Sequence, residues 1–232
     1  MSSFLELFDK MKKITFTFLT FFLVLGFSSG VEAQLVIDDF NSGTTTSQRG
    51  VGAASSAAAG LLGGERIQSL EVPSLSGDEF FGALGFTGGN LFLVQGSEDE
   101  VVGGLLYDSL NGIDLTGGGA YGGFRLDFTS VDSQISISDV LDLSVTSGDT
   151  TVSHNVTIPG QDSLGQVLVL FEDFEGVDFS SVDSVALDFD FTDNPGRDFQ
   201  LGSFIAVAVP EPSSLSVLSL AVSAMFLRRR RR

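Results

Sequence analysis

Carboxylates are the commonest side chains in this sequence that could do chemistry. The 232-residue chain has 30 Asp and Glu but only 12 Lys and Arg. Calcium binds about six to eight oxygen ligands, mainly from carboxylates and carbonyls. Asp38 and Asp39 lie near the start of the expected mature chain and Asp198 near its end, and the two ends of a β-sandwich often run side by side. With Glu65 as a fourth donor, these residues are our candidate ligands for a structural calcium ion, although the usual calcium-loop pattern is absent from the sequence.

Catalytic constellations are scarce. His154 is the only histidine, and alternation places it on one strand face with Val152 and Val156. Because no G-x-S-x-G motif accompanies it, we assign it a structural role. Glycoside hydrolysis needs two carboxylates flanking a sugar cleft, usually with aromatic walls. The chain has no Trp, its two tyrosines, Tyr107 and Tyr121, lie beside Gly-rich turns, and most phenylalanines occupy expected core positions. We therefore expect no enzymatic activity.

Charge and composition exclude further function classes. The net charge is −18, and residues 34–209 alone carry 26 acidic and four basic side chains, a net charge of −22. Such a domain repels nucleic acid, whose binding requires Lys and Arg. With no Cys, disulfides and thiolate metal sites are excluded, and a single His excludes multi-histidine zinc sites.

The elements that must position these residues have a period of two. Apolar and polar residues alternate in several segments separated by Gly, Asn and Asp turn signals, which indicates strands with one buried face. The clearest segments are 124–129, 135–138, 141–146 and 185–192. Residues 53–62 (AASSAAAGLL) are interpreted instead as a short helix or a loop.

Together these segments predict an all-β fold: a single antiparallel β-sandwich or jelly roll over residues 34–208. This acidic domain resembles extracellular jelly-roll domains of the galactose-binding type. The resemblance is based on Ile37-Asp38-Asp39-Phe40, on Gly63-Gly64-Glu65-Arg66 and on the expected closing strand from Asp198 to Val207.

The N-terminal region, residues 1–33, has the pattern of a secretory signal peptide. Lys12 and Lys13 precede an apolar run over residues 14–27, and Val31-Glu32-Ala33 offers a cleavage site between Ala33 and Gln34. The run is shorter than the roughly 20 residues that span a bilayer, which favours a removed signal over an anchor. We predict translation from Met11, because Glu6 and Asp9 do not fit the basic start of a signal. Signal peptidase and the Sec translocon would be its partners.

The C-terminal region, residues 209–232, has three consecutive parts. Pro210-Glu211-Pro212 interrupts regular structure, residues 213–227 are apolar enough for a short transmembrane helix, and five arginines follow. Arginines resist translocation and should remain in the cytoplasm, which leaves the acidic domain outside. The cluster comprises Arg228, Arg229, Arg230, Arg231 and Arg232.

This tail resembles the PEP-CTERM sorting signal of Gram-negative bacteria that secrete exopolysaccharide. The resemblance implies an exosortase as partner, a transient stay in the inner membrane, and cleavage near Pro210-Glu211-Pro212. The apolar run lacks the glycines common in such tails. An ordinary tail anchor with a basic flank is the alternative.

The function expected from the sequence is therefore that of an exported, non-enzymatic surface or extracellular-matrix protein, with exopolysaccharide as a candidate partner. An extracellular carbohydrate-binding jelly-roll module is the alternative, and a secreted glycoside hydrolase is a less favoured one.

Overall fold

The computed structural model describes residues 34–49, 51–60, 62–73, 82–96, 100–133, 140–192 and 196–209. The chain divides into two units, Met1–Ala33 and Gln34–Arg232, and every described residue belongs to the second. The predicted signal peptide with Ala33, and the predicted sorting signal from Pro210 to Arg232, lie outside the described residues, as does the expected strand at 135–138. Within the part that is described, no helix has the length and hydrophobicity needed to cross a bilayer.

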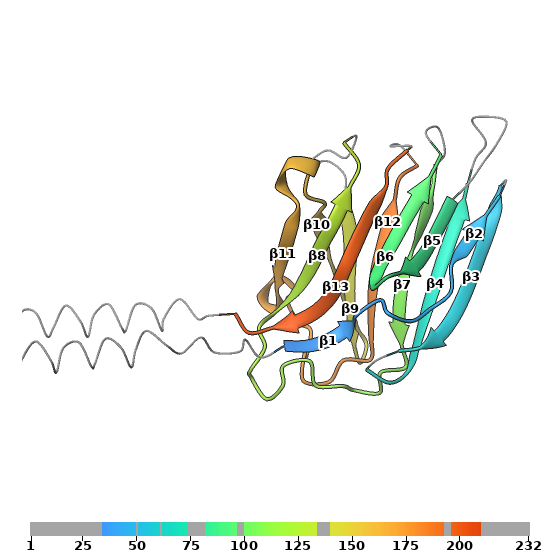
Figure 1. Cartoon of the computed structure of the whole chain (residues 1–232). Coiled ribbons are helices and arrows are strands. Elements are labelled where there is room, and N and C mark those ends of the chain that lie inside the picture. The colour runs from blue at the N-terminus through green and yellow to red at the C-terminus, as the bar shows by residue number, and fades with distance from the viewer. Residues whose placement is uncertain are drawn as a thin grey trace, which may run out of the picture. The chain divides into compact units, whose positions relative to one another are not determined.

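One antiparallel sheet, sheet A, has seven strands within the described residues (Figure 1). The order is β11-β8-β13-β6-β5-β2, and β1 also pairs with β13. The strands of sheet A are β1 (Gln34–Asp38), β2 (Thr46–Gln48), β5 (Gly82–Thr87), β6 (Asn90–Gln95), β8 (Gly123–Val131), β11 (Gly165–Leu170) and β13 (Phe199–Val207).

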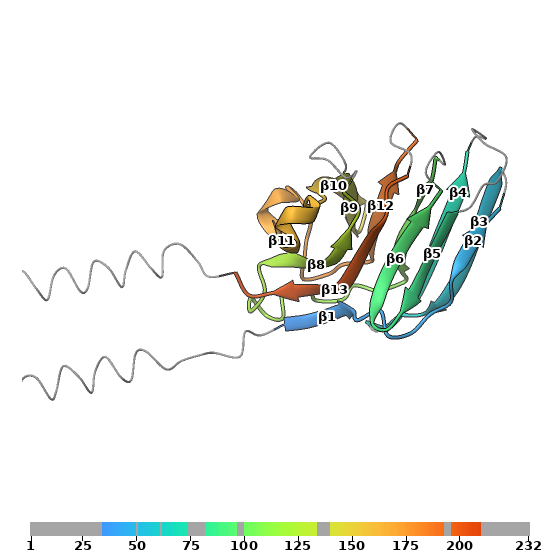
Figure 2. The ribbon, with the colours of Figure 1, turned by 45° about the horizontal axis from the view of Figure 1, so that its top comes forward.

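The second antiparallel sheet, sheet B, has six strands in the same described ranges, in the order β10-β9-β12-β7-β4-β3. It packs behind sheet A in Figure 1, and Figure 2 shows the two layers from a second angle. The strands of sheet B are β3 (Gly52–Ala59), β4 (Glu65–Val72), β7 (Val102–Asp108), β9 (Val140–Ser147), β10 (Thr150–Thr157) and β12 (Ser184–Asp190). Two short 3-10 turns, η1 (Gln161–Ser163) and η2 (Phe171–Asp173), flank β11. The expected all-β sandwich is confirmed.

The alternation in the sequence places side chains as predicted. In β12, Val185, Leu187 and Phe189 are buried between the sheets, while Asp188 and Asp190 are exposed. The same alternation holds in β9. A strand with one face against the core requires this period, because successive side chains point to opposite faces.

The interpretation of residues 53–62 as a helix or a loop was wrong for residues 53–59. Gly52–Ala59 forms strand β3, which pairs with β4 in an unbroken register from Gly52↔Val72 to Ala59↔Glu65. Alanine is a poor strand former by intrinsic preference. Here the backbone of β4 provides hydrogen-bond partners that local preference does not take into account.

The core lies between the two sheets and is rich in aromatic rings. The Phe124 ring lies 5.0 Å from that of Phe171 and 5.9 Å from those of Phe174 and Phe179, all in edge-on arrangements. Phe171 and Phe179 stack with centroids 4.0 Å apart. Such pairs contribute about 0.5–1.5 kcal/mol each beyond the apolar area that they bury.

Two bulges interrupt the pairing of β8 with β13. Ser130 pairs with Gln200 and Phe128 with Leu201, so Thr129 is an extra residue; Asp127 next pairs with Ser203, so Gly202 is another. A Cβ on Gly202 would lie 2.8 Å from Thr129 Cγ2, which explains the glycine. Bulges re-aim neighbouring side chains, and these two lie beside the outer-face pocket described below.

Candidate functional site

Asp38, the first expected calcium ligand, takes part in a buried network of hydrogen bonds. Its Oδ2 accepts hydrogen bonds from Arg66 Nη1 at 2.6 Å and from the Tyr107 hydroxyl at 3.0 Å, and its Oδ1 accepts one from the Phe40 amide at 2.8 Å. The Arg66 guanidinium also donates to the Ser42 carbonyl and lies 4.1 Å from the centre of the Phe86 ring. Burial, followed by the adjacent Asp38 charge, raises the pKa of Tyr107 well above its usual value.

The other three expected calcium ligands lie elsewhere. Asp39 accepts hydrogen bonds from the Asn41 backbone and side chain, which lower its pKa. Glu65 begins β4, while Asp198 immediately precedes β13, and Asp38 aligns with Phe204 in the later part of β13. The structure therefore does not bring the four together, and its described residues contain no group of three or more acidic or histidine side chains placed to hold a metal.

His154 packs where alternation placed it. Its ring lies 5.8 Å from the Phe174 ring, and it sits between the exposed residues Ser153 and Asn155 on β10. It therefore contributes to the packing of the sandwich.

The outer face of sheet A carries an aromatic ring, although the sequence predicts that most phenylalanines lie in the core. Leu91 and Leu93 of β6 are buried, so Phe92 between them points outward and is partly exposed. Phe92 pairs with Gly85 on one side and with Gln200 on the other. A Cβ on Gly85 would lie 2.8 Å from Phe92 Cζ, so the ring tip lies over this glycine.

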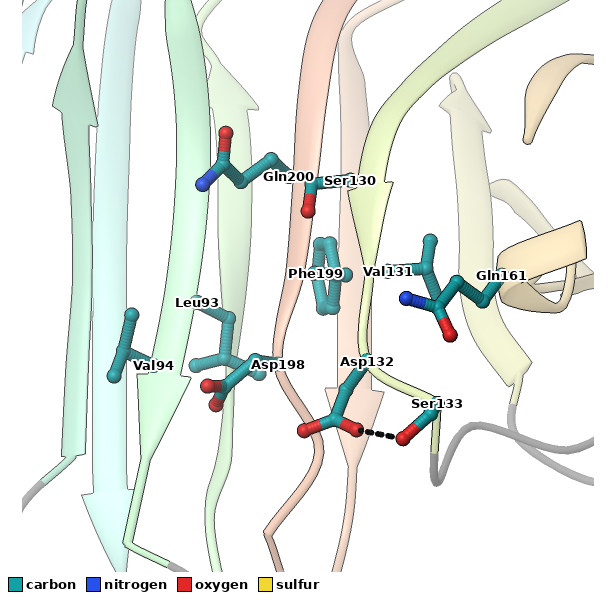
Figure 3. Close-up of a pocket in the computed structure, with 10 residues that line it drawn as sticks. All are labelled: Leu93, Val94, Ser130, Val131, Asp132, Ser133, Gln161, Asp198, Phe199 and Gln200. Carbon is teal, nitrogen blue, oxygen red and sulfur yellow. Dashed lines mark hydrogen bonds between the residues drawn. The ribbon is translucent and has the colours of Figure 1, made fainter.

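A pocket of about 380 Å³ lies across the ends of β6, β8 and β13, and its lining includes Leu93 and Gln200, which are the chain neighbour and the cross-strand partner of Phe92 (Figure 3). Its lining combines apolar surface with hydroxyl, amide and carboxylate groups. The lining residues are Leu93, Val94, Ser130, Val131, Asp132, Ser133, Gln161, Asp198, Phe199 and Gln200. Val94, which is 36% exposed, continues the outward row of Phe92 along β6.

The bulges bring polar groups to this pocket. Ser130 follows the extra residue Thr129 and lies opposite Gln200. A hydrogen bond fixes the position of the Thr129 side chain, because its hydroxyl donates to Asn90 Oδ1 on β6 at 2.9 Å. The Gln200 amide on β13 therefore lies next to Phe92, and the Ser130 hydroxyl on β8 lies one strand further along the same row.

Two carboxylates mark one end of the pocket. Asp198 accepts a hydrogen bond from the Gln95 amide at 2.9 Å, and the Asp132 amide donates to the Asp198 carbonyl at 2.9 Å. Burial, and then the nearby Asp132 charge, raises the pKa of Asp198, while the Gln95 hydrogen bond lowers it. Ser133 donates to Asp132 at 3.2 Å. Of the expected site residues, only Asp198 lies here.

The sequence contained one weak sign of this site. Residues 91–94 read Leu-Phe-Leu-Val, a continuous apolar run. Such a run does not reveal which residues face the core, so the sequence assigns Phe92 to neither face. The pocket itself joins residues from three strands that are distant in sequence.

No protein-family model matches the sequence, and a search of curated proteins finds no match. Among solved structures, the fold is distantly similar to carbohydrate-binding-module β-sandwiches. A family 11 module studied in solution has a TM-score of 0.40 and 16% identity, covering 79% of this chain and 99% of that chain. The family 11 module from Clostridium thermocellum, in complex with a β-1,3-1,4-mixed-linked tetrasaccharide, has a TM-score of 0.36 and 12% identity, covering 78% and 98%. A variant of a family 29 carbohydrate-binding module has a TM-score of 0.36 and 13% identity, covering 76% and 92%.

Proposed function

We propose that this chain is a non-enzymatic, exported surface or matrix protein that binds a neutral polysaccharide on the outer face of sheet A. The observation that carries the proposal is the partly exposed Phe92 ring beside a pocket of hydroxyl, amide and carboxylate groups. Sugars present apolar C–H faces that pack on aromatic rings, and hydroxyls that pair with polar side chains. Binding sites commonly combine apolar surface with a few placed polar groups.

Charge selects the class of polysaccharide. Residues 34–209 have a net charge of −22, and the pocket carries Asp132 and Asp198. An anionic polymer would meet repulsion both from the whole domain and from the pocket. A neutral polymer would meet none, and its hydroxyls could donate to the carboxylates. The expected ligand is therefore neutral and rich in hydroxyl groups.

The arrangement of the two carboxylates favours binding over hydrolysis. Glycoside hydrolysis requires two carboxyl groups that flank the scissile bond. Asp132 and Asp198 are instead hydrogen-bonded backbone neighbours in one sheet. We assign them to hydrogen bonds with sugar hydroxyls on one side of the ligand.

The test is binding of the full-length protein, in mild detergent, to neutral and anionic polysaccharides. Phe92→Ala and Gln200→Ala should each weaken binding to a neutral polysaccharide about tenfold, equivalent to about 1.4 kcal/mol. Leu106→Ala and Asn155→Ala, both on the outer face of sheet B, are the matched controls and should bind like the unaltered chain.

Two results would overturn the proposal. One is saturable binding to anionic but not to neutral polysaccharides. The other is unchanged affinity in both the Phe92 and Gln200 variants. Release of new reducing ends during incubation would show that the protein hydrolyses the polysaccharide, which would contradict a purely binding function.

The delivery route rests on the two ends of the sequence. In our proposal the N-terminal signal directs export, the C-terminal segment holds the precursor in the inner membrane, and an exosortase cuts near Pro210-Glu211-Pro212. C-terminal peptide mapping in strains with and without the sorting protease tests this route. The mature protein should end near Val209–Pro212 only when the protease is present. Recovery of the intact tail in both strains would leave a permanent anchor.

A further inference from the structure

Charged residues avoid both edges of sheet B. Each interior strand carries at least one acidic side chain: Glu65 and Glu71 in β4, Asp108 in β7, Asp142 in β9, and Asp188 and Asp190 in β12. The edge strands β3 (GAASSAAA) and β10 (TTVSHNVT) contain no Asp, Glu, Lys or Arg. In a domain with 26 acids, this is the reverse of the usual pattern, in which charges protect exposed edges.

Other devices that block strand pairing are also missing from these two strands. Each has eight residues, neither contains proline, and both pair with their inner neighbour in a regular register without a bulge. Within the described residues, β3 pairs only with β4, and β10 only with β9. Each therefore has one side where no strand of the described residues pairs with its backbone N–H and C=O groups, which is a template for adding another strand.

Three of the four large hydrophobic side chains that are exposed among the described residues lie at the same two sides of the sandwich, and the fourth, Val94, lies on the outer face of sheet A. Val51, 55% exposed, directly precedes β3; Leu164 and Leu168, 43% and 50% exposed, belong to the β11 edge. Figures 1 and 2 both place β11 on the β10 side, opposite β2 and β3.

We propose that copies of this chain assemble head to tail, with β3 of one copy pairing with β10 of the next. Sheet B has six strands and all of its pairings are antiparallel, so β3 and β10 run in opposite directions. If a second copy is shifted sideways without rotation, its β10 lies antiparallel to β3 of the first copy. The inner faces of the two B sheets then form one continuous surface, and so do their outer faces. An interface of this kind does not close and produces an open filament.

Charge identifies the partner as a second copy. Two domains of net charge −22 repel one another wherever acidic faces meet, and the uncharged edges are where like-charged copies can approach closely. Both halves of the interface are present on every chain, including apolar side chains at each. An unrelated partner would not require matched edges at both ends.

The test uses the full-length protein in density-matched detergent, with assembly measured by sedimentation velocity over a range of concentrations. The unaltered chain should form an open-ended series of species. Ser55→Asp, at the centre of β3, and Ser153→Asp, on β10, should each reduce assembly at least about tenfold, because a charge would enter the new strand pair. Ser69→Asp is the matched control: Ser69 is exposed, lies opposite Ser55 in the register, and belongs to the inner strand β4. It should assemble normally, and melting curves should show that all three variants fold.

Mixing the variants tests the head-to-tail geometry. Ser55→Asp copies retain a normal β10, and Ser153→Asp copies retain a normal β3. An equimolar mixture should therefore form heterodimers and nothing larger. Loss of assembly only in Ser55→Asp, without rescue on mixing, would overturn the proposal in favour of a two-fold β3 dimer. Equal assembly of the Ser55→Asp and Ser69→Asp variants, or a monomeric unaltered chain, would overturn strand pairing altogether.

Discussion

Asp38 and Arg66, which are 28 positions apart, form a buried ion pair that joins the two sheets. Arg66 Nη1 lies 2.6 Å from Asp38 Oδ2, and each side chain is 2% exposed. Asp38 belongs to β1 of sheet A and Arg66 to β4 of sheet B. The pair therefore ties the first described strand to the opposite layer, with Tyr107 of β7 as a third member.

Removing one partner of this pair should strongly destabilise the fold. Asp38→Ala leaves the Arg66 charge buried without a counter-ion, which typically costs about 3–5 kcal/mol. Urea unfolding followed by circular dichroism measures the change. Asp39→Ala alters the exposed neighbour and should cost less than about 1 kcal/mol. Tyr107→Phe removes one hydrogen bond to a charged group, for a loss of about 1.5–3 kcal/mol. Equal effects of Asp38→Ala and Asp39→Ala would contradict the importance of the pair.

Gln95 and Gln68 should respond in opposite ways to the same substitution. Both are buried, but neither amide atom of Gln95 has a hydrogen-bond partner among the described residues, whereas Gln68 Nε2 donates to the Leu84 carbonyl. Gln95→Met removes an unsatisfied amide and should raise the free energy of unfolding by about 1–3 kcal/mol. Gln68→Met removes the hydrogen bond to the Leu84 carbonyl and should lower the free energy of unfolding by about 0.5–1.5 kcal/mol. Denaturant midpoints measure both, and destabilisation by Gln95→Met would refute the prediction.

Asp188 makes the domain less stable as the pH rises. Partial desolvation by the surrounding side chains, and then the neighbouring Asp142 charge, raises the pKa of Asp188 above the usual aspartate value of 3.8. The folded protein holds this proton more tightly than the unfolded chain does. The resulting stabilisation is present below pH 3.8 and is lost as the pH rises through the raised pKa. Asp188→Asn should therefore raise the melting temperature at neutral pH and have less effect in acid.

Asp178 supplies a control of opposite sign. Hydrogen bonds from the Ser180 side chain and backbone lower its pKa, so its stabilisation is present above pH 3.8 and is lost as the pH falls through the lowered value. Asp178→Asn should lower the melting temperature at neutral pH. The same direction of change in both variants would contradict these assignments.

Added salt should stabilise the domain. Residues 34–209 carry a net charge of −22, and the screening length falls from about 30 Å at 0.01 M to about 3 Å at 1 M ionic strength. Self-repulsion in the folded state therefore weakens as sodium chloride is added, and the melting temperature should rise. Scanning calorimetry at several salt concentrations measures the effect. A melting temperature that falls over this range would be incompatible with repulsion as the main electrostatic contribution.

The sequence by itself determined the fold class and most of the strand faces. Alternation in β9 and β12 correctly identified the buried Leu141, Leu143, Leu187 and Phe189, because a strand with one wet face leaves a period of two in its residues. The inward position of His154 followed from the same pattern. This information is local, so a single sequence reveals it.

Tertiary structure alone decided which distant residues meet. The pairing of Asp38 with Arg66, the strand at β3 and the outward position of Phe92 were not predicted. Local preference does not include the backbone of a neighbouring strand, and the apolar run around Phe92 has no alternation from which to assign a face. Asp132 and Asp198 meet because β8 and β13 are adjacent in sheet A. That adjacency depends on strand order, which results from packing over the whole domain and leaves no periodic signal in either segment.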